Sequence, residues 1–122
     1  MKPGQAIMDD KITIYQKPTC SKCRATLAIL DQSGRAFDSI NYYEQPLTVE
    51  LLRELVRKLN IPVRGLLRAD EPLAQGSESL NDEALLQLMA DNPDLIQRPI
   101  VVRGDNAVLG RPPENVSKLL AE

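Results

Sequence analysis

Residues 12–33 read ITIYQKPTCSKCRATLAILDQS, and this stretch decides the fold of the chain. It begins with a β-branched and aromatic run, Ile12–Tyr15, which is typical of a short buried strand, and the run stops at a proline-containing turn. In Ser21–Ser33 the apolar residues recur at helical spacing, and Gly34 follows as a residue type that often ends helices. The stretch therefore predicts a strand, a turn and a helix, with Cys20 at the N-terminus of the helix.

Downstream of this unit, the sequence predicts further strands and short helices. The expected strands are Phe37–Tyr43, the end of Leu95–Val102, and its hairpin partner Ala107–Leu109. The expected helices are one that opens at Thr48 with a capping-box pattern, a short helical turn at Val63–Arg68, a helix at Asp82–Ala90, and a last helix that Pro112 and Pro113 open and that reaches Leu120. The order β-α-β, helices, β-β-α predicts one α/β unit with a helical insertion between the second and third strands.

Length and composition predict a single globular domain. The 122 residues fit one domain, since single domains most often have about 100–150 residues. Apolar residues make up 43% and charged residues 26%, close to the averages of globular proteins. The formal net charge of −2 argues against a general nucleic-acid or membrane binder, because such proteins present a basic surface to phosphates.

The sequence also predicts a cytoplasmic protein. No stretch approaches the roughly 18 apolar residues of a membrane span, and the beginning of the chain carries no signal-peptide pattern. Residues 1–10 are expected to form a flexible N-terminal extension, and either Met1 or Met8 fits as the translation start. No heptad pattern demands a partner helix, so the expected form is a monomer.

Cysteine and histidine usage indicates redox chemistry rather than a metal site. The chain has no histidine, and a structural zinc needs four ligands, typically thiolates and imidazoles, of which only Cys20 and Cys23 are present. A disulfide between cysteines this close would form almost no loop and would add little stability. The Cys-x-x-Cys pair is therefore interpreted as a reactive pair, with no bound metal or cofactor.

Cys20 is the expected nucleophile of this pair. Only a thiolate attacks, and a helix N-terminus or a nearby cation lowers a thiol pKa that is ordinarily about 8.5. Cys20 has both aids, since Lys17 and Lys22 lie nearby, and the N–H groups that follow it can also hold an oxyanion. Cys23 lies about one helical turn later and is a candidate resolving thiol, and its position on the apolar face of the helix also fits a role in packing alone.

Four separated motifs then point to a known family. They are Pro18–Arg24, Val63–Arg68, Arg98–Val102 and Gly110–Glu114. Together they resemble the glutaredoxin-dependent arsenate reductase (ArsC) family, over nearly the whole chain from about Lys11 to the C-terminus. The resemblance implies a thioredoxin-like fold with a helical insertion, as a single domain over residues 1–122, which agrees with the order of elements above.

The resemblance also implies roles for individual residues. Cys20 would attack arsenate, and Arg68, Arg98 and Arg111 would surround the oxyanion or the covalent arsenic adduct. Guanidinium groups suit this role because they stay charged and offer a planar fork of donors to a tetrahedral oxyanion.

Two positions in these motifs leave alternatives open. Arg64 stands about one helical turn from Arg68 and is an alternative to it as the residue that faces the site. The resemblance implies that Pro99 follows a cis peptide bond and lies against the active thiol, although an ordinary proline that starts a strand also fits this position.

Two further positions depart from the best-known members of the family. Gln16 and Lys17 stand where His-Asn is common, and the histidine is thought to lower the pKa of the cysteine, so Lys17 is the candidate substitute. Cys23 stands where many members have serine or another residue without a thiol and rely on glutathione and glutaredoxin. A local thiol would allow an internal Cys20–Cys23 disulfide, which thioredoxin or glutaredoxin would then reduce.

The function expected from these residues is the thiol-dependent reduction of arsenate to arsenite. One alternative is a general thiol-disulfide oxidoreductase acting on another substrate, since a fold does not fix a substrate. Another is an Spx-type regulator, a relative whose Cys-x-x-Cys is a redox switch and whose partner is the RNA polymerase α-subunit. Arg68 and Gly110–Pro113 resemble the reductase pattern and favour the enzyme.

Overall fold

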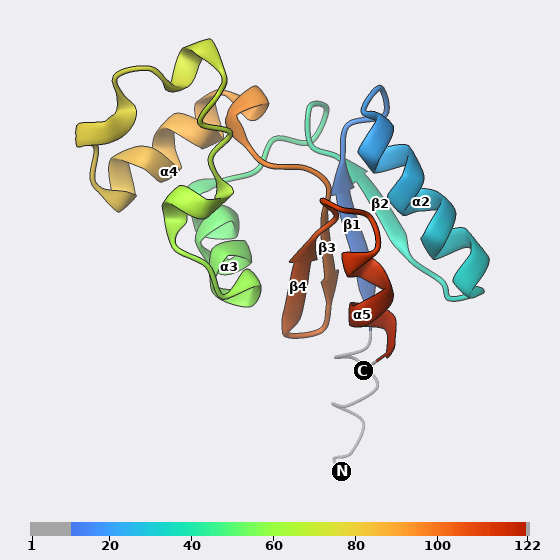
Figure 1. The fold of residues 1–122 in the computed structure, drawn as a ribbon. Coiled ribbons are helices and arrows are strands. Elements are labelled where there is room, and N and C mark those ends of the chain that lie inside the picture. The colour runs from blue at the N-terminus through green and yellow to red at the C-terminus, as the bar shows by residue number, and fades with distance from the viewer. Residues whose placement is uncertain (1–10, 122) are drawn as a thin grey trace. The chain divides into compact units, whose positions relative to one another are not determined.

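The computed structural model describes residues 11–121, in which one mixed sheet is accompanied by helices (Figure 1). The strands are β1 (Ile12–Gln16), β2 (Asp38–Asn41), β3 (Ile100–Arg103) and β4 (Asn106–Leu109), in the spatial order β2-β1-β3-β4. The α-helices are α2 (Ser21–Ser33), α3 (Val49–Leu59), α4 (Asp82–Asp91) and α5 (Asn115–Ala121). By their contacts the described residues divide into two compact units, one of residues 11–41 with 98–121 and one of Tyr42–Gln97. The predicted extension at residues 1–10 lies outside the described residues.

The first unit contains the whole sheet. β1 is central and pairs in parallel with β2 and antiparallel with β3, and β3 forms an antiparallel hairpin with β4. Parallel neighbours cannot be joined by a tight turn, so the chain crosses from β1 to β2 through α2. This crossover places the start of α2 directly after the end of β1.

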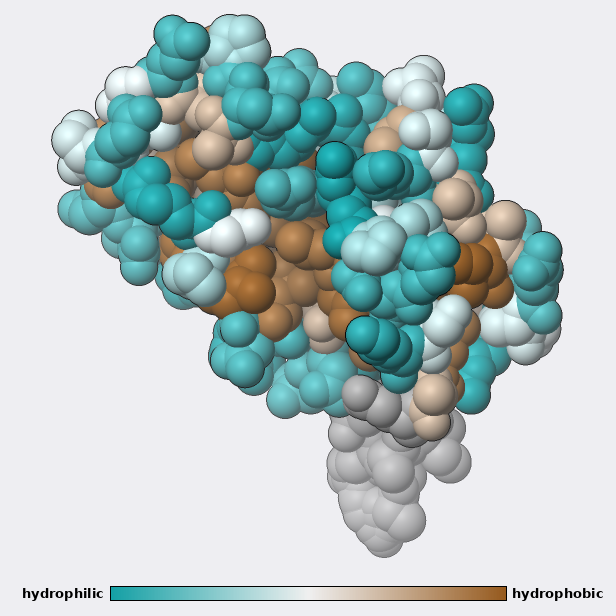
Figure 2. Space-filling model, in the orientation of Figure 1, coloured by the Kyte–Doolittle hydropathy of each residue, from teal (hydrophilic) through white to brown (hydrophobic). Residues whose placement is uncertain are grey.

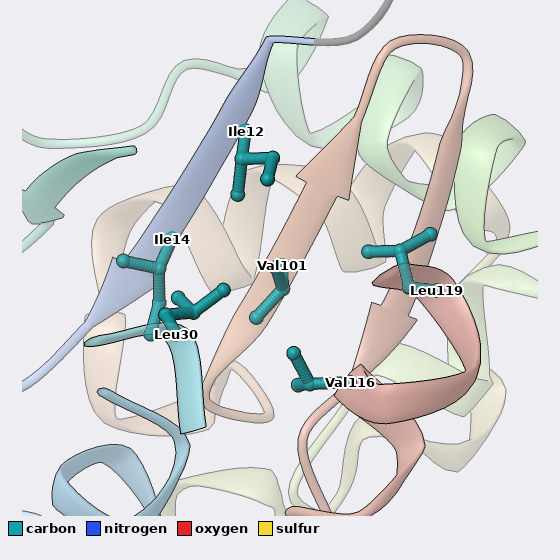
Figure 3. Close-up of a cluster of buried hydrophobic side chains, with 6 residues drawn as sticks. All are labelled: Ile12, Ile14, Leu30, Val101, Val116 and Leu119. Atoms are coloured by element: carbon teal, nitrogen blue, oxygen red, sulfur yellow. The ribbon is translucent and has the colours of Figure 1, made fainter. Parts of the chain in front are cut away.

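Apolar side chains fix α2 and α5 on one face of the sheet (Figure 3). None of the six buried residues in this cluster is more than 2% exposed, and full burial of such a side chain contributes about 1.5–3 kcal/mol. The cluster consists of Ile12, Ile14, Leu30, Val101, Val116 and Leu119. Because α2 is anchored in this way, the position of its first residues relative to β1 is fixed as well.

Side-chain caps begin both long helices of the second unit. The Oγ1 atom of Thr48 accepts a hydrogen bond from the Leu51 N–H at 3.1 Å, and the Oδ1 atom of Asn81 accepts one from the Ala84 N–H at 2.9 Å. In a full capping box, a Glu or Gln at the third helical position accepts a hydrogen bond from the backbone N–H of the cap residue. Leu51 occupies that position and has no acceptor group. The predicted box at Thr48 is therefore only half formed.

Apolar packing and one ion pair join α3 to α4. The guanidinium of Arg53 on α3 lies 2.7 Å from the carboxylate of Glu83 on α4. The buried residues of the two helices are Leu52, Leu55, Leu85, Leu86 and Met89. The helical insertion thus has its own small core.

The predicted α/β fold with an insertion between the second and third strands is confirmed. β2 is shorter than predicted because Tyr42 belongs to the insertion, where its ring is buried and its hydroxyl donates to the Ile96 carbonyl at 3.3 Å. The last helix begins at Asn115 rather than at Pro112, because a turn comes first in which the Asn115 N–H donates to the Pro112 carbonyl. The prediction of one domain over residues 1–122 stays a prediction.

Hydrophilic side chains cover most of the surface seen in Figure 2. Among the described residues, Leu73 is the large apolar side chain that is well exposed, at 56%. No helix within residues 11–121 is both long enough and apolar enough to cross a membrane.

Candidate active site

Cys20 is the N-cap residue of α2. Its backbone is extended, with φ −86° and ψ 126°, and its carbonyl accepts a hydrogen bond from the Arg24 N–H at 3.1 Å. The N–H of Cys20 donates to the Lys17 carbonyl at 3.0 Å, which closes the turn between β1 and α2. Its side chain is partly exposed. The predicted position of Cys20 at the helix N-terminus is therefore confirmed.

The surroundings of Cys20 lower the pKa of its thiol. Burial alone would raise this pKa, but hydrogen bonding from the Cys23 thiol and from the N–H groups of Cys23 and Lys22 favours the thiolate. The positive charge of Arg98 acts in the same direction. The helix N-terminus, the second thiol and one arginine together outweigh the cost of removing the charge from water.

Cys23, in contrast, is held in its protonated form. Its side chain is fully buried, and burial raises the pKa of its thiol to about 12, even though the Lys17 N–H donates to its Sγ atom at 3.5 Å. Its neighbour Cys20 adds to the rise. The two thiols are therefore unequal at neutral pH, since Cys20 ionises first while Cys23 keeps its proton and donates it in a hydrogen bond.

Gln16 and Lys17 precede this pair, at the end of β1 and in the turn that leads to α2. Gln16 is buried at the end of β1, and its Nε2 atom donates to the Ser39 hydroxyl at 3.0 Å. Lys17 reaches Cys23 through its main-chain N–H, and Arg98 is the cation that lowers the pKa of both cysteines. The idea that the Lys17 ammonium replaces a histidine charge stays a prediction.

The pH dependence of alkylation tests this inequality of the thiols. We expect iodoacetamide to modify Cys20 with a half-maximal rate below the pH of about 8.5 that is usual for a free thiol, and to leave Cys23 unmodified in the folded protein. In Cys23→Ala the curve should move to higher pH, because a hydrogen-bond donor to the thiolate is lost. Peptide mapping by mass spectrometry measures both. A wild-type midpoint at or above that of free cysteine would contradict the assignment.

Pro99, just before β3, and Gly110, just after β4, lie in contact in the first unit. The Arg98–Pro99 peptide bond is cis, as the resemblance implied, and the Arg111–Pro112 bond is cis as well. The Gly110 N–H donates to the Pro99 carbonyl at 2.8 Å. A Cβ atom on Gly110 would lie 2.7 Å from both Pro99 Cγ and Thr26 Oγ1. Only glycine therefore allows the chain to pass this close to the proline and to α2.

The loop between β4 and α5, which begins with Gly110, presents Arg111 to solvent. The Asn115 side chain holds the loop by donating from Nδ2 to the carbonyls of Leu109 at 3.0 Å and of Arg111 at 3.5 Å. The Arg111 side chain is exposed, and within residues 11–121 its guanidinium forms no hydrogen bond or ion pair. The backbone of Arg111 is thus fixed while its guanidinium stays available to a ligand.

Replacing Gly110 with alanine tests how tightly this loop is packed. We expect Gly110→Ala to destabilise the protein by about 1–3 kcal/mol, which is typical of overpacking, because the new Cβ meets a proline ring and α2. Urea unfolding measures the loss. Gly65→Ala is the matched control, since its Cβ meets only the Ile61 side chain, at 3.3 Å. Equal stability of Gly110→Ala and wild type would show that the loop can move to accommodate the added Cβ.

In the second unit, Arg64 and Arg68 have different surroundings. The Nη2 atom of Arg64 donates to three carbonyls, those of Ser77 at 3.1 Å, Glu78 at 3.3 Å and Leu80 at 2.9 Å. Arg68 instead forms a looser ion pair, with 3.6 Å between its Nη2 and the Oε2 of Glu71. The contacts of Arg64 therefore indicate a structural role, whereas the binding of a ligand by Arg68 stays a prediction.

The predicted site residues are thus divided between the two units. Cys20, Cys23, Arg98, Pro99 and Arg111 belong to the first unit, and Arg68 belongs to the second. The sequence analysis missed Glu71 and Asn115, which contact Arg68 and Arg111, and Thr26, which lies beside Gly110. Only Glu71 was visible in the sequence, as an acidic residue three positions after Arg68.

Metal-ligating side chains do not cluster in the part of the chain that the structure describes. Within residues 11–121, no three side chains of the types His, Cys, Asp and Glu come together as ligands would. The side chains described above supply a thiolate, a second thiol and cationic donors.

Comparison with known proteins agrees with these features. The model of the ArsC family matches residues 15–119. The chain is 40% identical over 118 residues to "Uncharacterized protein YfgD" of Escherichia coli K12, covering 93% of this chain and 99% of the relative. It is 35% identical over 115 residues to a protein of Neisseria meningitidis named "Arsenate reductase", covering 90% of this chain and 98% of that one.

A solved structure shows the same fold. The structure described as an arsenate reductase from Vibrio cholerae superposes with a TM-score of 0.85 at 42% identity, covering 88% of this chain and 96% of that one. The fold with its sheet order and helical insertion is therefore shared with thioredoxin-like proteins of this kind.

Proposed function

Because the chain belongs to the ArsC family, we propose that it reduces arsenate to arsenite with Cys20 as the nucleophile. The observation that carries this proposal is the inequality of the two thiols, with the pKa of Cys20 lowered at a helix N-terminus and that of Cys23 raised to about 12. The names of the similar proteins from N. meningitidis and V. cholerae support arsenate as the substrate.

In the first step, the Cys20 thiolate attacks the arsenic atom of arsenate. A sulfur–arsenic bond forms, an arsenic–oxygen bond breaks, and the leaving oxygen takes up protons and departs as water. Arg68, Arg98 and Arg111 are proposed to hold the oxyanion, because charge-assisted hydrogen bonds from guanidinium groups are the strongest available to it. The N–H groups at the start of α2 would hold the developing negative charge.

In the second step, a thiol releases arsenite. One route uses Cys23, whose sulfur attacks the Sγ atom of Cys20, so that a disulfide forms and the sulfur–arsenic bonding pair stays on arsenic as it becomes trivalent. The Cys20 thiolate is one cause of the high pKa of Cys23. Formation of the adduct removes this thiolate, so the pKa of Cys23 should then fall. The other route uses glutathione at the same position. Thioredoxin, or glutaredoxin with glutathione, would then return the protein to its reduced form.

The proposed compartment and cofactor requirement follow from this chemistry. A reaction that starts from a thiolate needs a compartment that keeps thiols reduced, so we place the protein in the cytoplasm. It needs no bound cofactor, because the electrons come from thiols. The acting form is proposed to be a monomer.

Arsenate-dependent NADPH oxidation tests the proposal. Wild-type protein is assayed with either the thioredoxin or the glutaredoxin system supplying electrons, with arsenate or a small disulfide as the oxidant. Turnover with arsenate, and none without it, is the expected result. Reduction of the small disulfide without arsenate turnover would assign the protein to general thiol-disulfide exchange. Inactivity in every combination, with oxidation-dependent binding to the RNA polymerase α-subunit, would favour a regulator.

The two arginines of the second unit give a paired prediction. We expect Arg68→Ala to raise the KM for arsenate about tenfold to a hundredfold, as for the loss of a hydrogen bond to a charged group. Arg64→Ala should leave KM near the wild-type value but lower the stability of the insertion, because three carbonyls lose their donor. Steady-state kinetics and thermal unfolding separate the two effects. A larger KM effect for Arg64→Ala would reverse the assignment.

A further inference from the structure

The backbone of Arg68 is fixed more firmly than its side chain. Its N–H donates to the Leu95 carbonyl at 2.7 Å, and the preceding residue, Leu67, bridges antiparallel to Ile96. Both contacts lie within the second unit. The Cα position of Arg68 is therefore set by main-chain pairing, while the orientation of its long side chain depends on what the guanidinium touches.

Glu71 is the residue that the guanidinium touches. The Glu71 N–H donates to the Arg68 carbonyl at 3.1 Å, so one turn of backbone links the two residues. Their side chains form an ion pair with 3.6 Å between Nη2 and Oε2, and they are only 18% and 30% exposed. A partly buried pair is screened less by salt than a surface pair. The contact therefore restrains the Arg68 side chain.

We propose that Glu71 is a positioning residue, which holds the Arg68 guanidinium ready for the oxyanion. The inference rests on the proposed function, because it assumes that Arg68 binds arsenate. At 3.6 Å the pair is longer than a hydrogen bond and involves a single Nη atom. The guanidinium has five N–H donors in a planar fork, so most of them stay available to a ligand. A carboxylate placed in this way orients the guanidinium of Arg68 and leaves most of its N–H donors for the oxyanion.

The proposal predicts the direction of the effect. Ordering a long side chain on binding has an entropic cost. Because Glu71 already restrains the Arg68 side chain in the free protein, less entropy is lost when the substrate binds. Removing the carboxylate should therefore weaken arsenate binding. A carboxylate that instead competed with the oxyanion for Arg68 would have the opposite effect, since its removal would tighten binding.

The experiment compares Glu71→Gln with Glu71→Asp and with Glu83→Gln as the matched control. Glu83 forms an ion pair with Arg53 in the same unit, outside the motif that carries Arg68. We expect Glu71→Gln to raise the KM for arsenate about two- to tenfold, in line with the ordering of one side chain, with little change in kcat. Glu71→Asp should recover much of the loss, and Glu83→Gln should match wild type. Thermal unfolding of all variants identifies any general loss of stability.

A second readout does not need turnover. Arsenate should protect Cys20 from alkylation, and the concentration that gives half protection should rise in Glu71→Gln by the same factor as KM. An unchanged or lower KM in Glu71→Gln, or an equal rise in Glu83→Gln, would overturn the proposal for Glu71 while wild-type turnover continues. Absence of both turnover and protection in wild type would overturn the proposed function itself.

Discussion

Replacing Cys20 with serine is expected to abolish arsenate reduction, with kcat/KM falling by on the order of a thousandfold or more, as for the loss of other catalytic nucleophiles. A serine hydroxyl keeps the size of the side chain but does not ionise near neutral pH. The helix N-terminus, the Cys23 thiol and Arg98, which together lower the pKa of Cys20, then have no thiolate to stabilise. Arsenite production with either reductant system measures the loss.

Cys23→Ser is the matched variant for this experiment. It removes the second sulfur but keeps a small hydrogen-bond donor beside Cys20. If Cys23 resolves the adduct, turnover supported by thioredoxin should be lost and turnover with glutathione and glutaredoxin should remain. Equal arsenite production by Cys20→Ser and wild type would remove Cys20 from the reaction, whatever the result for Cys23→Ser.

The second large effect is expected at Arg98. We expect Arg98→Met to lower kcat/KM for arsenate about tenfold to a hundredfold, the range for losing a hydrogen bond to a charged group. The same change should raise the pKa of Cys20, because the charge of Arg98 is one of the causes that lower it. The pH at which Cys20 is alkylated at half its maximal rate reports this shift separately from turnover.

Two further variants sharpen the test at Arg98. Arg98→Lys keeps the positive charge but loses the planar fork, so it should restore the pKa of Cys20 better than it restores the KM for arsenate. Arg24→Met removes an exposed arginine from the first turn of α2 and serves as the control. A loss in Arg24→Met as large as in Arg98→Met would indicate a general effect of surface charge rather than a specific role for Arg98.

Local patterns predicted the frame of the fold. The β-branched run of β1 is followed by a helix that starts with Cys20 at its cap, and both occur where the periodicity placed them. Such features depend on residues that are neighbours in the sequence, so the sequence carries them directly. The same is true of the cap at Thr48, whose hydroxyl binds an N–H three residues later.

Features that depend on distant partners were harder to predict. β2 ends early because Tyr42 is buried in the insertion and binds Ile96, 54 residues away. The last helix starts late because its proline-rich beginning forms a turn, with the Asn115 side chain donating back to Leu109. Periodicity does not register such contacts, since they are made by tertiary packing.

The candidate site shows the same division. The helix N-terminus alone predicted that Cys20 is the thiol that ionises first. The burial that raises the pKa of Cys23 to about 12 depends instead on tertiary packing, which the spacing of residues does not reveal. The choice between Arg64 and Arg68 depended on three carbonyls that lie more than ten residues from Arg64 in the sequence. No spacing rule identifies these partners.

Peptide mapping after a single turnover tests most directly whether arsenate reduction begins at Cys20. Reduced protein is mixed with arsenate and glutathione, the reaction is stopped by acid, and mass spectrometry locates every oxidised thiol while arsenite is measured in parallel. The predicted result is arsenite together with a modified Cys20, joined either to Cys23 or to glutathione. Arsenite formed while Cys20 remains a free thiol, or modification confined to Cys23, would contradict the account.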